Sequence, residues 1–297
     1  MEIKNVAVLG SGTMGHGIAQ ASAMAGYNVK LYDIAQAMLD KATGTIKGNI
    51  EKHFVAKGKI KPEEGAAIVG RIAATTNLKS AVEDADLVIE AIPENMEMKK
   101  IVFAEIDGFC PAHTILASNT SVLPVTAIAG ATNRKEKCIG LHFFNPAVVM
   151  KLVEVIKPIG VADETVDAAL AFCKKLGKTP VTVKDVPGFI VNRLLGLLYH
   201  EAAQIVLEGT ATAEEVDLAM KLGAGHPMGP CELADFGGFD IITNAGDAVY
   251  NYTHNARDAV NILYRKMVEA GRLGRKNGKG FYDYNSDGTK TVAKLFD

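Results

Sequence analysis

The sequence has 297 residues, more than one compact domain usually holds, so two domains are the first expectation. Hydrophobic residues make up 48% of it and charged residues 22%, as in globular proteins, and no apolar stretch approaches the roughly 20 residues that span a bilayer. A formal net charge of −2, with no Lys- or Arg-rich tract interleaved with aromatic residues, argues against a nucleic-acid partner and favours a small ligand.

The start of the chain and its cysteines predict the compartment. The N-terminus leads directly into the strand-like KNVAVLG, without the charged and apolar segments of a secretory signal, so export is not expected. Four scattered cysteines lack C-x-x-C spacing and indicate neither a metal site nor a disulfide framework: Cys110, Cys138, Cys173 and Cys231. We therefore expect a protein of the reducing cytoplasm, with no membrane partner.

In the first part of the chain, short runs of β-branched residues alternate with helical patterns. The strand candidates are, in order, IKNVAVL, NVKLYD, ADLVIEAI, TILASNT, CIGLHFF, KLVEVI and TPVTVK. The last two follow only a short turn or one helix, at about 163–176, and are expected to extend the same sheet. This alternation predicts an α/β fold with a mostly parallel sheet of seven or eight strands.

The pattern changes at KDVPG, near residues 184–188, where proline and glycine interrupt the chain. We predict a first domain at 1–185 and a second at 186–297. In the second, TAEE at 212–215 reads as a capping box that opens a helix. Before it, apolar residues follow one helical face: Ile190, Leu194, Leu197, Leu198, Ile205 and Val206. The second domain is therefore expected to be helical, with a final FYDY strand or turn.

The first motif, GSGTMG at 10–15, follows the first strand and opens a helix of small residues. Gly10 permits a tight turn, Gly12 lets a pyrophosphate approach the backbone, and Gly15 lets the helix pack on the strand. The second strand ends at Asp33, where a carboxylate can accept hydrogen bonds from ribose hydroxyls. The combination predicts a dinucleotide site rather than a glycine turn without a ligand. The residues of this predicted site are Gly10, Ser11, Gly12, Thr13, Met14, Gly15 and Asp33.

Asp33 also favours NAD over NADP. A carboxylate about 4 Å from a 2′-phosphate would cost roughly 4 kcal/mol at an effective dielectric constant near 20. Comparable catalytic efficiency with NADPH would contradict this expectation.

The second motif is GLHFFNP, in which His142 ends a strand candidate. Open α/β sheets place their chemistry at the carboxyl ends of parallel strands. Glu154 lies in the equally apolar run KLVEVI, and a buried carboxylate needs a partner. If the two runs are neighbours, Glu154 can hold one imidazole nitrogen while the other exchanges a proton with a substrate. A core histidine satisfied by a carboxylate for structural reasons is the alternative.

Two further polar residues are candidates for the same site. SNTS at 118–121 ends the preceding strand, and its hydroxyl and amide groups could donate to a carbonyl oxygen or form a turn. Asn192, in PGFIVNR at the start of the first helix beyond the boundary, could reach the site or simply face solvent.

Six motifs together resemble the L-3-hydroxyacyl-CoA dehydrogenases, and among them the bacterial 3-hydroxybutyryl-CoA dehydrogenases. They are, in chain order, VLGSGTMGHGIA, ASNTS, GLHFFNP, MKLVEVI, DVPGFIVNR and LGAGHPMGP. The resemblance covers nearly the whole chain. It implies a Rossmann-type NAD-binding domain, a helical C-terminal domain that forms a homodimer, and NAD-linked interconversion of 3-hydroxyacyl-CoA and 3-oxoacyl-CoA, with short acyl chains favoured.

The resemblance also implies residue roles. His142 corresponds to the general acid/base and Glu154 to its orienting carboxylate, while Ser121, Asn145 and Asn192 surround the reacting oxygen. Glu94 and Lys99 match family positions near the cofactor, and Asn145 is also expected to contact the cofactor.

Residues 47–61 contain five lysines and resemble the family's coenzyme A contact region, which suits a ligand with several phosphates. Lys52 and Lys57 are the candidates, and Asn49 stands where some relatives have a contacting serine. A solvated helix face is the alternative here.

Two other functions stay open at this point. A related dehydrogenase of a free hydroxy acid or sugar acid would act without coenzyme A and would be indifferent to the lysines. A non-catalytic dinucleotide-binding protein could use the same fold, because fold alone does not fix function.

Overall fold

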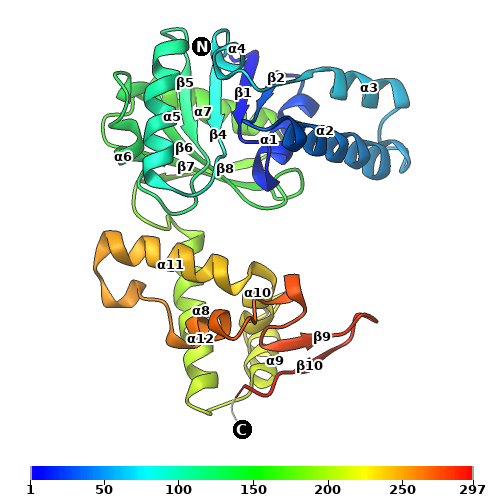
Figure 1. The fold of residues 1–297 in the computed structure, drawn as a ribbon, viewed down its shortest axis with the longest axis vertical. Coiled ribbons are helices and arrows are strands. Elements are labelled where there is room, and N and C mark those ends of the chain that lie inside the picture. Colours follow the sequence, from blue (N-terminus) through cyan, green and yellow to red (C-terminus); the bar gives the residue numbers. More distant parts are fainter. Residues whose placement is uncertain (1, 296–297) are drawn as a thin grey trace. The chain divides into compact units, whose positions relative to one another are not determined.

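The computed structural model describes residues 2–295, and the chain divides into two compact units, Met1–Phe189 and Ile190–Asp297 (Figure 1). The first unit contains a mostly parallel sheet covered by helices, and the second is mainly helical. Both features confirm the fold class that the alternation of strands and helices predicted. No helix among the described residues is long and apolar enough to cross a membrane.

Eight strands form the sheet of the first unit, in the order β3-β2-β1-β4-β5-β6-β7-β8. Neighbouring strands are parallel except β6 and β7, which are antiparallel. The strands are β1 (Asn5–Leu9), β2 (Asn28–Tyr32), β3 (Ile72–Thr75), β4 (Leu87–Glu90), β5 (Ile115–Ser118), β6 (Cys138–Phe143), β7 (Leu152–Lys157) and β8 (Thr179–Lys184). The sheet is therefore mostly parallel, as predicted.

Seven of these strands were expected from the sequence, and β3 was not. Its sequence, IAAT, is short, and none of its residues is fully buried because it lies at the edge of the sheet. A strand that buries so little apolar surface leaves no alternating pattern in the sequence.

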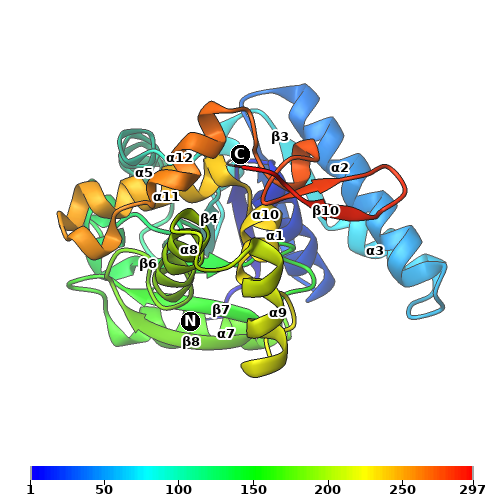
Figure 2. The same ribbon diagram turned by 90° about the horizontal axis from the view of Figure 1, so that it is seen from below.

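The helices of the first unit cover both faces of the sheet. They are α1 (Thr13–Met24), α2 (Gln36–Ile50), the π-helical turn η1 (Glu51–Val55), α3 (Pro62–Gly70), α4 (Leu78–Val82), α5 (Met96–Phe109), α6 (Val125–Ala129), the 3₁₀ turn η2 (Lys135–Lys137) and α7 (Asp163–Lys175). The α2–η1–α3 segment projects away from the sheet in both views (Figure 1, Figure 2).

Two apolar cores explain why the parallel strands are apolar throughout. Val6 and Val8 of β1 belong to a core with residues of α1, α2 and α7. Ala7 and Leu9 belong to a second core with residues of α4, α5 and α6. Because alternate side chains enter opposite cores, a strand buried on both faces reads as a continuous hydrophobic run.

The strand order places a switch point between β1 and β4. The chain winds from β1 outward to β2 and β3, then returns to β4 on the other side of β1. Loops at the carboxyl ends of these two neighbouring strands therefore diverge, and in such sheets ligands bind in the crevice between them. The glycine motif follows β1 at this edge, and Glu90 ends β4 beside it.

The second unit packs five helices around an aromatic core. They are α8 (Val191–Leu207), α9 (Ala213–Gly223), α10 (Pro230–Gly237), α11 (Phe239–Thr253) and α12 (Ile262–Glu269), with the 3₁₀ turns η3 (Ala256–Asp258) and η4 (Arg275–Asn277). Thr212 and Glu215 form the predicted capping box of α9. FYDY contributes to β9 (Tyr282–Tyr284), which pairs with β10 (Lys290–Val292) in a small hairpin.

Candidate active site

The turn after β1 has the geometry of a dinucleotide loop. Gly10 has φ 92°, and a Cβ there would lie 2.6 Å from the carbonyl oxygen of Ala91. A Cβ on Gly15 would lie 1.7 Å from the carbonyl oxygen of Gly10. Both positions therefore require glycine, the first for backbone conformation and the second for close packing of α1 on β1.

Gly12 differs from these two glycines. A Cβ at this position would meet no described atom within 4 Å, so protein packing does not demand a glycine. Gly12 is the N-cap of α1, and among the described residues no side chain caps this helix. The backbone N–H groups of the first turn are thus open to an anion, and these residues fit the pyrophosphate of a dinucleotide.

Asp33 is held against this turn. It follows β2, and its Oδ2 accepts hydrogen bonds from the backbone N of Ser11 at 2.9 Å and from Ser11 Oγ at 2.8 Å. Its Oδ1 accepts one from the backbone N of Ala35 at 3.2 Å. The carboxylate thereby connects the end of β2 to the glycine turn, which places it where the ribose contact was predicted. The ribose contact itself stays a prediction.

His142 and Glu154 form a buried pair. β6 and β7 are antiparallel neighbours, and these two residues lie directly opposite each other. His142 Nδ1 is 2.7 Å from Glu154 Oε2, and the two residues are 5% and 0% exposed. The ring centroids of Phe144 and Phe189 lie 4.3 and 5.7 Å, respectively, from the centroid of the imidazole. Since Nδ1–H donates to the carboxylate, Nε2 is the nitrogen left to exchange a proton.

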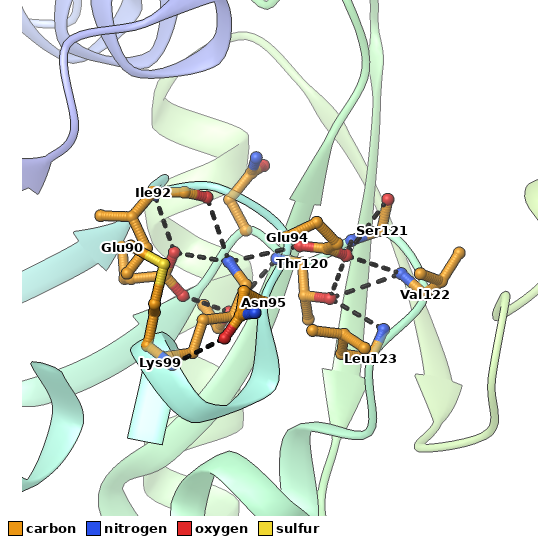
Figure 3. Close-up of polar contacts among 12 residues, drawn as sticks. Glu90, Ile92, Glu94, Asn95, Lys99, Thr120, Ser121, Val122 and Leu123 are labelled. Atoms are coloured by element: carbon orange, nitrogen blue, oxygen red, sulfur yellow. Dashed lines mark hydrogen bonds and ion pairs between the residues drawn. The ribbon is translucent and has the colours of Figure 1, made fainter. Parts of the chain in front are cut away.

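The loop after β5 is held by Glu94. Its Oε1 accepts hydrogen bonds from Thr120 Oγ1 at 2.6 Å, from the backbone N of Ser121 at 2.8 Å and from that of Val122 at 3.2 Å (Figure 3). Ser121 Oγ lies 3.3 Å from the same oxygen. Burial alone would raise the pKa of Glu94, but the Lys99 ammonium and these hydrogen bonds hold the pKa below its ordinary value.

Lys99 connects Glu94 to a residue that sequence analysis did not select. This lysine, 1% exposed, lies on α5, and its Nζ is 3.3 Å from Glu94 Oε2 and 2.6 Å from Glu90 Oε1 (Figure 3). Glu90 is fully buried at the end of β4. The signal was available, because an acidic residue within the apolar run ADLVIEAI needs a partner for the same reason as Glu154.

The remaining predicted site residues belong to other elements. Asn145 is an exposed residue after β6. Asn192 lies in the first turn of α8, in the second unit. Lys52 in η1 and Lys57 just beyond it are exposed on the projecting α2–η1–α3 segment. Their proposed contacts with substrate or cofactor stay predictions.

Comparisons with known proteins bear on the whole chain. Residues 5–186 match the model of the NAD-binding domain of 3-hydroxyacyl-CoA dehydrogenase, and residues 188–284 match the model of its C-terminal domain. The probable 3-hydroxybutyryl-CoA dehydrogenase of Bacillus subtilis is 45% identical over 284 residues, which cover 96% of this chain and 98% of the relative. The human mitochondrial hydroxyacyl-coenzyme A dehydrogenase is 43% identical, with 95% and 91% covered.

A solved structure agrees with these sequence relatives. The crystal structure of (S)-3-hydroxybutyryl-CoA dehydrogenase from Ralstonia eutropha is 41% identical and superposes with a TM-score of 0.92, covering 96% of this chain and all of that one. The resemblance seen in the motifs is thereby confirmed. The chain belongs to the 3-hydroxyacyl-CoA dehydrogenase family and carries that family's NAD-binding domain.

Proposed function

We propose that this protein interconverts (S)-3-hydroxybutyryl-CoA and acetoacetyl-CoA with NAD as the hydride carrier. The observation that carries the proposal is the 2.7 Å contact between His142 and Glu154, at the same edge of the sheet as the dinucleotide turn. The names of the relatives from Bacillus subtilis and Ralstonia eutropha support the choice of a short acyl chain.

His142 acts as the general acid and base in this proposal. The nicotinamide, when bound, supplies or accepts the hydride at the 3-carbon. In reduction, His142 donates a proton from Nε2 to the developing alkoxide, while Glu154 holds Nδ1 and stabilises the imidazolium. In oxidation, the same Nε2 accepts the proton of the substrate hydroxyl. Ser121 and Asn192 donate hydrogen bonds to the reacting oxygen and stabilise its negative charge.

The substrate comparison tests this function. Purified protein would be given acetoacetyl-CoA, a longer 3-oxoacyl-CoA and free acetoacetate, each with NADH and with NADPH, and cofactor oxidation would be followed. We expect the highest kcat/KM with acetoacetyl-CoA and NADH. Equal activity on free acetoacetate would favour a hydroxy-acid dehydrogenase instead, and absence of turnover with every substrate would favour a non-catalytic dinucleotide-binding protein.

We also propose that the protein forms a homodimer through its C-terminal unit and works in the cytoplasm. Several large apolar side chains of that unit are exposed, among them Leu194, Leu218, Leu222, Phe236 and Ile241. Exposed apolar groups of this kind favour a covered surface. The four cysteines are all free and buried, which suits a reducing compartment.

A further inference from the structure

A buried charged cluster connects the ends of β4 and β5 at the proposed active site. Glu90 accepts hydrogen bonds from Lys99 Nζ at 2.6 Å, from the backbone N of Ile92 at 2.8 Å and from Ser118 Oγ at 2.7 Å. Lys99 comes from α5 and Ile92 from the loop after β4 (Figure 3), and Ser118 ends β5. A single carboxylate thereby fixes three segments at the edge where the dinucleotide turn lies.

Stability alone does not account for this cluster. Removing two charges from water carries a desolvation penalty that often equals or exceeds their attraction, so an apolar pair of similar size would hold the strands at least as well. Here two carboxylates, Glu90 and Glu94, share one ammonium group, that of Lys99. Glu90 and Lys99 are buried, whereas the Glu94 side chain is 33% exposed, so the cluster leads from the interior to the loop that carries Ser121. Such an arrangement is better explained by the position it imposes than by the stability it adds.

These contacts form a series of ion pairs and hydrogen bonds that leads from Glu90 to Ser121. Glu90 holds Lys99 at 2.6 Å, and Lys99 holds Oε2 of Glu94 at 3.3 Å. With Oε2 held, Oε1 of Glu94 faces the loop after β5 and accepts from Ser121 and its two neighbours in the chain. The place of Ser121 thus depends on Glu94, that of Glu94 on Lys99, and that of Lys99 on Glu90.

We propose that Glu90 is a positioning residue of the active site, which acts through Lys99 and Glu94 to hold the Ser121 loop in its reactive position. The inference rests on the proposed function, in which Ser121 donates to the reacting oxygen. Glu90 itself touches neither substrate nor cofactor in this role.

Glu90→Gln is the variant that tests the charge with little change of shape. The amide oxygen can still accept from Lys99 and Ile92, and the amide nitrogen can donate to Ser118 Oγ. The lost charge, however, leaves Lys99 drawn toward Glu94, which then moves away from the Ser121 loop. We expect kcat/KM for acetoacetyl-CoA to fall by about 10- to 100-fold, because small misplacements at a reacting centre have effects of that size.

Two readouts separate positioning from a merely structural role. NADH affinity, measured by nicotinamide fluorescence, should change much less than kcat/KM. The Tm should fall because the buried Lys99 ammonium loses a charged partner, so the kinetics are measured well below the Tm of the variant. The matched control is Glu97→Gln, the same change on an exposed side chain of α5, the helix that carries Lys99; Glu97 is paired with Lys100 at 3.2 Å. This control should leave every parameter unchanged.

A double-mutant cycle tests the route. If Glu90 acts through the Ser121 loop, adding Glu90→Gln to Ser121→Ala should cost little beyond the larger single effect, because coupled residues are not additive. Multiplied losses, or Glu90→Gln with wild-type kinetics, would overturn the inference. Should Glu90→Gln fail to fold, Ser118→Ala replaces it, since it removes the hydroxyl that donates to Glu90; a several-fold lower kcat/KM supports the inference, and wild-type kinetics overturn it.

The same experiment distinguishes the positioning role from the proposed function. If the wild-type protein reduces acetoacetyl-CoA and Glu90→Gln is equally active, the positioning role is wrong and the proposed function is retained. If the wild-type protein lacks that activity, both the proposed function and the positioning role are wrong.

Discussion

His142 and Glu154 lie side by side because the chain reverses direction between β6 and β7. In an antiparallel pair, directly opposed residues share one face of the sheet, so the carboxylate reaches the imidazole without leaving its strand. Burial on both sides keeps water from competing for the hydrogen bond. The pair therefore has a fixed geometry, as a general acid/base needs.

We predict that His142→Ala abolishes most of the activity. Loss of the general acid/base should lower kcat by about 10²- to 10⁴-fold in both directions, with NADH affinity little changed. Stopped-flow kinetics and fluorescence titration measure the two quantities. His113→Ala is the control, because its side chain is half exposed and bound to Asp86. Wild-type turnover in a folded His142→Ala protein would remove this residue from the mechanism.

At the scale of elements, the turn between β1 and α1 combines two kinds of glycine. Gly10 and Gly15 satisfy the packing of the protein itself, whereas Gly12 leaves room for a ligand. Substitutions should therefore separate folding from cofactor binding, although the positions are close in the sequence.

We predict that Gly12→Ala folds normally and weakens NADH binding by roughly 10-fold or more, because its methyl group occupies the path of the pyrophosphate. Gly15→Ala should lower the Tm as well, since its Cβ would overlap the Gly10 carbonyl. Gly44→Ala, in α2, is the control: a Cβ there would meet no described atom within 4 Å, so it should raise stability by up to about 1 kcal/mol. Unchanged NADH affinity in Gly12→Ala would contradict the pyrophosphate site.

The exposed lysines of the α2–η1–α3 segment should contribute to coenzyme A binding. Lys52→Ala and Lys57→Ala should each raise the KM for acetoacetyl-CoA several-fold with little change in kcat, and the effect should shrink at high salt because exposed charges are screened. Lys79→Ala, on α4, is the control. If neither lysine variant changes the KM, this face is merely solvated, and the phosphates of coenzyme A bind elsewhere.

At the scale of the whole molecule, assembly depends on the apolar surface of the second unit. Leu218 and Leu222 lie four residues apart on α9, on one helical face, and are 54% and 79% exposed. Two adjacent exposed leucines favour contact with another subunit over contact with water.

We predict that Leu218→Asp/Leu222→Asp shifts the protein toward the monomer in sedimentation equilibrium. Ile159→Asp, which changes an 82% exposed residue of the first unit, should leave the dimer intact. A monomeric wild-type protein, or a double variant that dimerises as tightly as wild type, would contradict this assignment of the interface.

The stability of the second unit should depend on pH through Asp235. Burial raises the pKa of this carboxyl to about 6, although the backbone of Phe281 and Tyr282 and the hydroxyl of Tyr284 donate to it. The folded state therefore keeps its proton where the unfolded state, with a pKa near 4, has lost it. By linkage, this contribution is complete below pH 4 and is lost as pH rises through 6, a loss of about 3 kcal/mol.

The Tm of the wild-type protein and of Asp235→Asn, measured at pH 5 and pH 7, checks this prediction. The variant, which cannot ionise, should show a smaller decrease of the Tm between pH 5 and pH 7 than wild type, whatever its absolute Tm. An equal decrease in both proteins would show that Asp235 does not titrate in this range.

The sequence by itself determined the features whose causes lie close together in the chain. The glycine turn, the strand runs buried on both faces and the Thr212 capping box each follow from a few adjacent residues. Their local conformation does not depend on distant parts of the molecule.

Only the tertiary structure decided which distant groups meet. It made β6 and β7 neighbours, which turned the possible pairing of His142 and Glu154 into a 2.7 Å contact. It added β3 at the sheet edge, where little burial leaves no pattern. It also brought Ser118 to Glu90 and the backbone of Ser121 to Glu94, because the energy of a buried polar group depends on partners that only folding brings within reach.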